Sequence, residues 1–248
     1  MQYSFGTGVL FGRRTDVSNP TPVQFGGLQG VTLDMSFTTK ELFSQYQFPI
    51  AIGRGTGKIT GKADFAQLNA QAFNDIFFGE TSGPTAGEYV TSVQEAQTVG
   101  AVAGNTIYPT YNTTYIQDLG VIVNSTGAVL TRVAATPGAT EYSCNETTGT
   151  YTFNSTNNAV AMRVSYMHTD TGNGKTVSIT NKLLGSAPVF LAVLTSTFQT
   201  KKLTLQLNKC MSSKISLATK LEDFTIPSFD FASWSDDSNM IGKLWLDE

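Results

Sequence analysis

Histidine is almost absent from this sequence of 248 residues, since His168 is the only one. A single imidazole leaves little room for a histidine-based metal site or for a catalytic triad that depends on histidine. The surrounding segment, MHTDTGNGK, has the composition of a hairpin turn, which favours a residue at the edge of a turn over a catalytic one. The sequence therefore gives no support to histidine-dependent catalysis.

Cysteine and charge are also scarce. Cys144 and Cys210 are too few for a disulfide framework in a chain of this length, so we expect two free thiols. Charged residues make up 14% of the sequence, against about a quarter in typical proteins. The net charge of −3 and the pI of about 5.2 give no overall basic field that would indicate nucleic-acid binding. A local basic face is still compatible with them.

Long apolar runs are missing as well, and the first residues of the sequence do not have the pattern of a secretory signal. No apolar run approaches the roughly 20 residues that cross a bilayer. The first residues, MQYSFGTGVLFGRRTDV, have no basic segment followed by a continuous apolar stretch. We therefore expect no membrane insertion and synthesis in a cytoplasm.

The glycine-rich segment IAIGRGTGKITGKADF, residues 50–65, does not match a nucleotide-binding loop. The lysine of GTGK is followed by isoleucine rather than Ser or Thr, and the glycine spacing of the dinucleotide fingerprint is missing too. The segment instead alternates with the period of a strand, which puts the glycines on one face and Arg54, Lys58 and Lys62 on the other. It predicts a long strand with a polar face and a closely packed glycine face.

The neighbouring segments predict a mainly β chain. VTLDMSF, residues 31–37, alternates apolar and polar residues, and the short connection TTKELFSQYQFP leads from it to the glycine-rich strand, so the two predict an antiparallel pair. Apolar residues then recur at helical spacing over about 65–78, with Asp64 placed to cap the start and Gly79 to end the helix. Serial short strands after residue 160 complete the expected fold, a mainly β sandwich or barrel with one flanking amphipathic helix.

Two regions are less regular. The segment from about 80 to 158 is rich in Thr, Asn and Gly, and we interpret it as an elaborated loop and hairpin region or a small inserted subdomain within a single domain spanning 1–248. The C-terminal segment contains aromatic residues that either close the core of their own chain or dock on a neighbouring subunit. These residues are Phe224, Phe229, Phe231, Trp234 and Trp245.

No set of residues forms a catalytic constellation. The adjacent acids Glu222-Asp223 and Asp236-Asp237 would point in different directions on a strand, and DDSNMIG lacks the alternating acids of an EF-hand calcium loop. We therefore expect a protein that is not an enzyme and that holds neither a cofactor nor a metal.

Two segments resemble the tail tube proteins of tailed bacteriophages. They are TLDMSFTTKELFSQYQFPIAIGRGTGKITGKADFAQLNAQAFNDIFFG, residues 32–79, and SSKISLATKLEDFTIPSFDFASWSD, residues 212–236. The resemblance does not extend to the polar middle of the chain, from roughly 80 to 160.

The resemblance implies a structural protein of the virion with a tail-tube-like fold. In this family six copies close into a ring around a channel, and stacked rings form a tube that conducts the genome. The implied partners are further copies of the chain and other tail proteins, namely the tail terminator, the tail tip and the tape measure protein, while phage DNA would pass without specific binding. The chain would be made in the cytoplasm of a bacterial host and would reside in the virion. Residues implied at the channel or between rings are Asp34, Lys40, Glu41, Arg54, Lys58 and Lys62.

Two other functions remain open on the residues alone. A carbohydrate-binding module of a phage or bacterial surface, such as an adhesin or fibre domain, would stack Tyr108, Tyr111 and Tyr115 on sugar rings. A glycan hydrolase would use carboxylates that lie far apart in the sequence.

Overall fold

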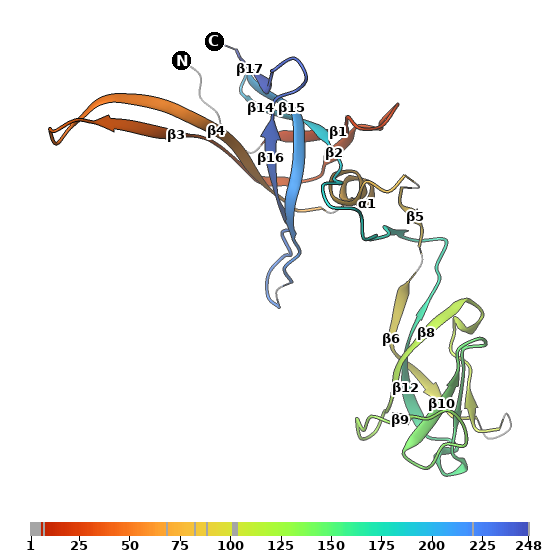
Figure 1. Cartoon of the computed structure of the whole chain (residues 1–248). Helices are drawn as coiled ribbons and strands as arrows, with labels where there is room; N and C mark the ends of the chain where they lie inside the picture. The colour runs from red at the N-terminus through yellow and green to blue at the C-terminus, as the bar shows by residue number, and fades with distance from the viewer. Residues whose placement is uncertain are drawn as a thin grey trace. The chain divides into compact units, whose positions relative to one another are not determined.

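The computed structural model of this chain describes residues 6, 8–67, 69–81, 83–87, 89–100, 104–219 and 221–247. The chain divides into two compact units (Figure 1). Unit 1 combines Met1–Pro84 with Val177–Glu248, and unit 2 is the continuous segment Thr85–Thr176. Unit 2 contains most of the polar segment 80–158, together with a strand that follows this segment. The assignment of the whole chain to a single domain stays a prediction.

Strands dominate both units, and the expected mainly β fold with one flanking helix is confirmed: 53% of the residues are in strands and 6% in helix. Unit 1 is built on one eight-stranded sheet with the order β2-β1-β14-β15-β16-β4-β3, to which β17 adds by pairing with β15. Its strand pairs are antiparallel. The strands are β1 (Val9–Arg14), β2 (Val23–Phe25), β3 (Leu28–Phe43), β4 (Pro49–Phe65), β14 (Phe190–Phe198), β15 (Lys201–Ser216), β16 (Ser228–Trp234) and β17 (Gly242–Leu246).

Unit 2 has its own sheets and its own core. One sheet has the order β6-β12-β8 and the other β7-β11-β10-β9. Its elements are β6 (Val90–Thr98), β7 (Thr106–Ile107), η2 (Asn112–Thr114), β8 (Tyr115–Val123), β9 (Thr131–Arg132), β10 (Glu141–Asn145), β11 (Thr150–Phe153), η3 (Ser155–Asn157) and β12 (Ala161–His168). The two ends of the unit meet in a short ladder, because β5 (Thr85–Ala86) pairs with β13 (Lys175–Thr176).

The flanking helix of unit 1 is short and covers one face of the sheet. α1 (Ala70–Phe73) continues directly into a π-helical turn, η1 (Asn74–Phe78). Ala72 and Ile76 belong to the same core cluster as the sheet residues Phe65 and Phe229. The helical spacing of the apolar residues is therefore explained by this packing.

The two ends of the helix differ in how well the sequence predicts them. Gly79 ends it in the left-handed conformation, at φ 61°, as expected. The expected cap at Asp64 is wrong, because Asp64 lies within β4. Asn69 caps the helix instead, and its side chain accepts a hydrogen bond from the Gln71 amide at 2.8 Å. Leu68, which the helical pattern also includes, lies outside the described residues.

The later strand predictions are confirmed in part. Residues 161–168 of the segment VAMRVSYMH form β12, in which Met162, Val164 and Tyr166 are completely buried. KTVSITNK alternates like a strand, but only Lys175–Thr176 is one. The two cysteines are free thiols, as expected.

Gly61 in β4 marks a very close contact in the core of unit 1. Phe231 lies directly opposite Gly61 on β16 and is only 4% exposed. A Cβ atom at Gly61 would lie 2.2 Å from Cζ of this ring. The glycine therefore makes space for a side chain of the neighbouring strand, rather than for a facing sheet.

Replacing Gly61 by valine should destabilise unit 1 by about 1–3 kcal/mol, because the branched side chain overpacks the Phe231 ring. The matched control is Gly53→Val on the same strand, where the nearest atom to an added Cβ is the Lys40 carbonyl oxygen at 3.9 Å. Urea unfolding followed by tryptophan fluorescence measures the difference, since both tryptophans belong to unit 1. Equal stability of the two variants would contradict this explanation of the glycine.

Candidate functional site

The β3–β4 hairpin of unit 1 extends beyond the rest of its sheet (Figure 1). Only residues 59–64 of β4 pair with β16. Further out, β3 and β4 pair with each other as far as Phe43 opposite Pro49. Residues 44–48 connect them, so most of the segment predicted as a connection is strand.

One face of this hairpin continues the core face of the sheet. Val31 and Leu33 pack against the core of unit 1, and alternation along β3 places Met35 and Phe37 on the same face. Ile59 lies directly opposite Met35. Met35 is 56% exposed and Phe37 is 49% exposed. The apolar core face therefore continues beyond the core and is exposed to solvent. We call this exposed part the apolar face of the hairpin.

A β-bulge in β4 changes the expected alternation. Phe37 pairs with Gly57 and Thr39 with Arg54, so β4 has one residue more than β3 in this interval. Arg54 thereby lies on the apolar face, where its guanidinium carbon is 3.1 Å from the centroid of the Phe37 ring. The prediction that Arg54 shares a face with the two lysines of β4 is therefore wrong, because alternation holds only while the register does.

The bulge also separates two of the glycines. Thr38 lies opposite it, with its Oγ1 atom 3.1 Å from Oγ1 of Thr56. A Cβ atom at Gly55 would lie 2.5 Å from this Thr38 oxygen, whereas one at Gly57 would lie 2.7 Å from Cε1 of Phe37. The single glycine face predicted from the sequence is thus wrong at Gly55, because the two glycines make space for side chains on opposite sides of β3.

The other face of the hairpin is polar, and we call it the polar face. The register places four of the predicted contact residues on it, namely Asp34, Lys40, Lys58 and Lys62. The Lys62 amine lies 3.2 Å from the carboxylate of Asp64. The remaining two predicted residues, Glu41 and Arg54, lie on the apolar face.

The tip of the hairpin is apolar and aromatic. Tyr46 and Phe48 are 70% and 80% exposed, and Ile50 and Ile52 are 63% and 64% exposed. No charged residue occurs between Glu41 and Arg54 in the sequence. Exposed apolar surface on this scale is typical of an interaction site. The run LFSQYQFPIAI carries this signal in the sequence, although most of it is predicted there only as a connection between two strands.

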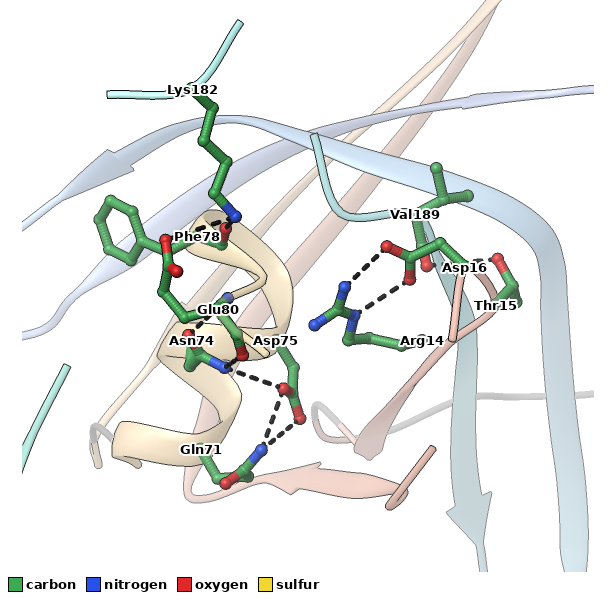
Figure 2. Close-up of polar contacts among 10 residues, drawn as sticks. All are labelled: Arg14, Thr15, Asp16, Gln71, Asn74, Asp75, Phe78, Glu80, Lys182 and Val189. Carbon is green, nitrogen blue, oxygen red and sulfur yellow. Dashed lines mark hydrogen bonds and ion pairs between the residues drawn. The ribbon is translucent and has the colours of Figure 1, made fainter. Parts of the chain in front are cut away.

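A polar cavity of about 540 Å³ opens between β1 and the helix of unit 1. Figure 2 shows that Arg14 donates to both carboxylate oxygens of Asp16, at 3.0 and 2.7 Å. The pKa of Arg14 is raised, chiefly by this hydrogen bonding to Asp16. On the helix side, Gln71 donates to both oxygens of Asp75, at 3.0 and 2.9 Å.

The remaining contacts around this cavity hold the chain that follows the helix. Asn74 is 1% exposed, and its side chain bonds both to the amide of Glu80, at 3.0 Å, and to its carbonyl, at 3.1 Å. Lys182 donates to the Phe78 carbonyl and lies 3.4 Å from the Glu80 carboxylate (Figure 2). The polar groups around the cavity thus bond to one another, which is the arrangement of a structural network.

In unit 2, Glu95 on β6 accepts several hydrogen bonds. Tyr166 Oη and Gln97 Nε2 each donate to it at 2.6 Å. The amide and the hydroxyl of Thr110 also donate, at 2.9 and 2.8 Å. Burial alone would raise the pKa of Glu95, but these hydrogen bonds outweigh burial and lower the pKa to about 2.

A second carboxylate of unit 2, Asp118, is nearly buried, with a side chain only 3% exposed. It accepts from the hydroxyls of Tyr142 and Tyr151, at 2.7 and 3.0 Å. Burial raises the pKa of both hydroxyls, so they remain protonated donors. The two carboxylates, Glu95 and Asp118, thus fix tyrosine side chains within the core of unit 2.

The tyrosines considered for sugar stacking have different environments. Tyr108 and Tyr111 are 54% and 48% exposed. The Tyr111 ring stacks on His168, with ring centroids 4.1 Å apart. Tyr115 packs against the rings of two other core tyrosines. Only the first two tyrosines therefore present accessible rings.

The aromatic residues of the C-terminal segment have two different environments, and docking of the exposed ones on a neighbouring subunit stays a prediction. Phe229 and Phe231 close the core, at 1% and 4% exposed. Phe224, Trp234 and Trp245 stay at the surface, at 88%, 38% and 52% exposed.

No family model matches this chain, and no curated protein matches it either. Within the described residues, no helix is both long and apolar enough to span a membrane. The same residues contain no group of three or more His, Cys, Asp or Glu side chains placed to hold a metal ion. The β3–β4 hairpin is our candidate functional site, because its apolar face is exposed.

Unit 2 should lose stability in acid as Glu95 becomes protonated. Because the pKa of Glu95 is lowered in the folded state, its contribution is present above the unfolded pKa of about 4.3 and disappears as the pH falls towards the folded pKa of about 2. Glu95→Gln should therefore lower the free energy of unfolding of unit 2 at neutral pH. It should also make that free energy depend less on pH between these two pKa values. Tyrosine near-ultraviolet circular dichroism during urea unfolding is the measurement, since most tyrosines lie in unit 2.

The control for this experiment is Glu146→Gln, which changes a carboxylate that is 52% exposed. In this variant the stability of unit 2 should depend on pH as it does in the wild type. An unchanged profile in Glu95→Gln would show that the hydrogen bonds to Glu95 do not contribute to acid sensitivity.

Proposed function

We propose that this protein is a structural virion protein, the tail tube subunit of a tailed bacteriophage. Copies of the chain would assemble into hexameric rings, and stacked rings would form a conduit for genome delivery. The hexameric count and the stacking come from the sequence resemblance. The observation that carries the proposal is the hairpin, whose apolar face continues the core of unit 1 and is exposed in the single chain.

The amphipathic character of the hairpin supports assembly with further copies. An apolar face of this length is costly to leave in water, and its burial against a neighbouring copy would stabilise an oligomer. The polar face, with Asp34, Lys40, Lys58 and Lys62, would remain in contact with water. This division suits a subunit that buries one side of its hairpin and presents the other to a channel.

The edge of the sheet gives a second line of support. β3 is the last strand of the path β2-β1-β14-β15-β16-β4-β3, so its outer edge lies at the end of the sheet in unit 1. A long edge strand with apolar residues is prone to aggregation unless another strand or element covers it. Closure of the sheet across subunits would cover it.

The remaining parts of the proposal follow from this assignment. The protein would act without catalysis and without a cofactor, and its partners would be its own copies, the tail terminator, the tail tip and the tape measure protein. It would be made in the cytoplasm of the bacterial host and would reside in the tail. The alternative, a carbohydrate-binding module, has the exposed rings of Tyr108 and Tyr111 in its favour.

Polar substitutions on the apolar face should prevent assembly, because they remove the surface that a neighbouring copy would bury. The variant Met35→Gln with Ile52→Gln tests this, and Ser36→Gln with Lys40→Gln is the matched control on the polar face of the same hairpin. Electron microscopy and sedimentation over a range of concentration are the measurements. The wild type and the control should form rings or tubes of uniform diameter with six-fold symmetry, whereas the first variant should stay monomeric.

Tube subunits sometimes require an initiator, so each protein is also offered a tail-tip initiator complex. A wild type that stays monomeric and joins no tube under these conditions would overturn the proposal. Equal assembly of both variants would show that the apolar face of the hairpin is not the contact surface.

Removal of unit 2 should leave assembly intact, because the hairpin and its sheet belong to unit 1. Residues 85–176 can be replaced by a short Gly/Ser connection, since the β5–β13 ladder brings the two ends of the segment together. Sedimentation and a glycan-array screen are run on both forms. Loss of assembly in the shortened protein would assign the contact surface to unit 2, and glycan binding that disappears with unit 2 would favour the carbohydrate-binding alternative.

A further inference from the structure

The face of the unit 1 sheet that points away from the helix is basic. We call it the outer sheet face and assign residues to it from strand register, because core residues occupy the opposite face. On β16, Phe229 and Phe231 are buried in the core, so Asp230 between them lies on the outer sheet face. Its register partners Lys62 on β4 and Lys214 on β15 lie there too.

The register extends this assignment across the other strands. Leu205 and Leu207 belong to the core side of β15, so Gln206 and its partner Lys243 on β17 lie on the outer sheet face. The same alternation places Lys202 there, opposite Thr197. The polar face of the hairpin continues this surface along β3 and β4. Together the two surfaces carry the basic residues Arg13, Lys40, Lys58, Lys62, Lys202, Lys209, Lys214 and Lys243 and the acidic residues Asp34, Asp64 and Asp230. Two further acids lie at the margin, Asp237 beside Lys209 and Asp247 beside Lys202.

Most of these basic side chains make no ion pair with a carboxylate. Lys62 pairs with Asp64 at 3.2 Å, and Lys209 pairs with Asp237 at 2.7 Å. In the part of the chain that the structure describes, the other basic side chains have no carboxylate within 4.0 Å. These side chains, all on exposed residues, are Arg13, Lys40, Lys58, Lys202, Lys214 and Lys243.

We propose that the outer sheet face binds the phosphate backbone of double-stranded DNA without sequence preference. Duplex DNA presents one negative charge per about 1.7 Å of its axis. One duplex therefore reaches cations on several strands at once, whereas a single carboxylate group reaches one or two of them. Lys58 and Lys62, for example, are about 13 Å apart along β4. Charge complementarity over an extended, open face thus favours a polyanion with regularly spaced charges.

This activity differs from what the chain's overall charge suggests. The net charge of −3 gives no attraction between DNA and the chain as a whole. The two surfaces together carry more basic than acidic residues, so a DNA duplex at the outer sheet face meets a local excess of positive charge. One copy of the chain is sufficient for this contact, and the inference does not rest on assembly into a tube.

The test compares two variants of the full chain that lose the same amount of positive charge. The outer-face variant is Lys58→Gln, Lys214→Gln and Lys243→Gln. The control variant is Arg54→Gln, Lys175→Gln and Lys201→Gln, which changes the apolar face of the hairpin, unit 2 and the core side of β15. Fluorescence anisotropy with a labelled duplex of random sequence measures the dissociation constant from about 50 to 200 mM salt, with sedimentation alongside to record the oligomeric state.

The wild type and the control variant should bind the duplex with an affinity that falls steeply with salt. The outer-face variant should bind more weakly for every sequence, and the slope of log K against log salt should decrease in magnitude by about 0.9 for each lysine removed. A Lys→Arg version of the same three positions should restore binding, which excludes misfolding as the cause. Absence of wild-type binding at about 50 mM salt, or an equal loss in both variants, would overturn the proposal.

Discussion

The pairing of β3 with β4 is the constraint on which the rest of unit 1 depends. These strands contain 16 and 17 residues, and β4 also pairs with β16 over the part of its length that lies in the body of the sheet. Beyond that, the hairpin has its own ladder, the contact of Arg54 with Phe37 and the pair of Thr38 with Thr56 at the bulge. An isolated two-stranded hairpin is marginally stable in water. The outer part of this one would therefore gain much of its stabilisation from a partner, which is the physical reason to propose it as a contact surface.

The bulge gives the hairpin its two distinct faces. With uninterrupted alternation, Arg54 would lie beside Lys58 on the polar face, and Ile52 would follow it there. One additional residue in β4 moves both to the other side, where Ile52 extends the apolar face and Arg54 covers the Phe37 ring. Bulges re-aim side chains in this way with little change to the rest of the ladder. From the body of the sheet out to Ile52, the hairpin thus has one mainly apolar face and one polar face.

The sequence predicted the features that depend on local period, and it missed those that depend on register. Alternation was sufficient to find β3, β4 and their antiparallel pairing, and Gly79 marked the end of the helix. No sequence pattern indicated the bulge, because residues 53–57 alternate glycine with larger side chains in either register. The helix cap was missed because Asp64 and Asn69 are both good capping residues, and tertiary contacts decide between them. The hydrogen bond from Tyr166 to Glu95 joins residues 71 positions apart, so local patterns carry no information about it. The sequence placed Asp34, Lys40, Glu41, Arg54, Lys58 and Lys62 on or next to this strand pair, but their distribution over two faces required the strand register.

The two faces of the unit 1 sheet make the two proposals compatible with each other. Contacts between copies would use the apolar surface that runs from the core onto Met35, Phe37 and Ile52. DNA would use the opposite surface, where basic residues such as Lys58 and Lys214 outnumber the acidic ones. Because side chains alternate across a strand, both surfaces come from the same strands without competing for space. An assembly that buries the apolar surface therefore leaves the basic one free, and any closed ring built in this way would carry a lysine-rich sheet face on one of its two sides.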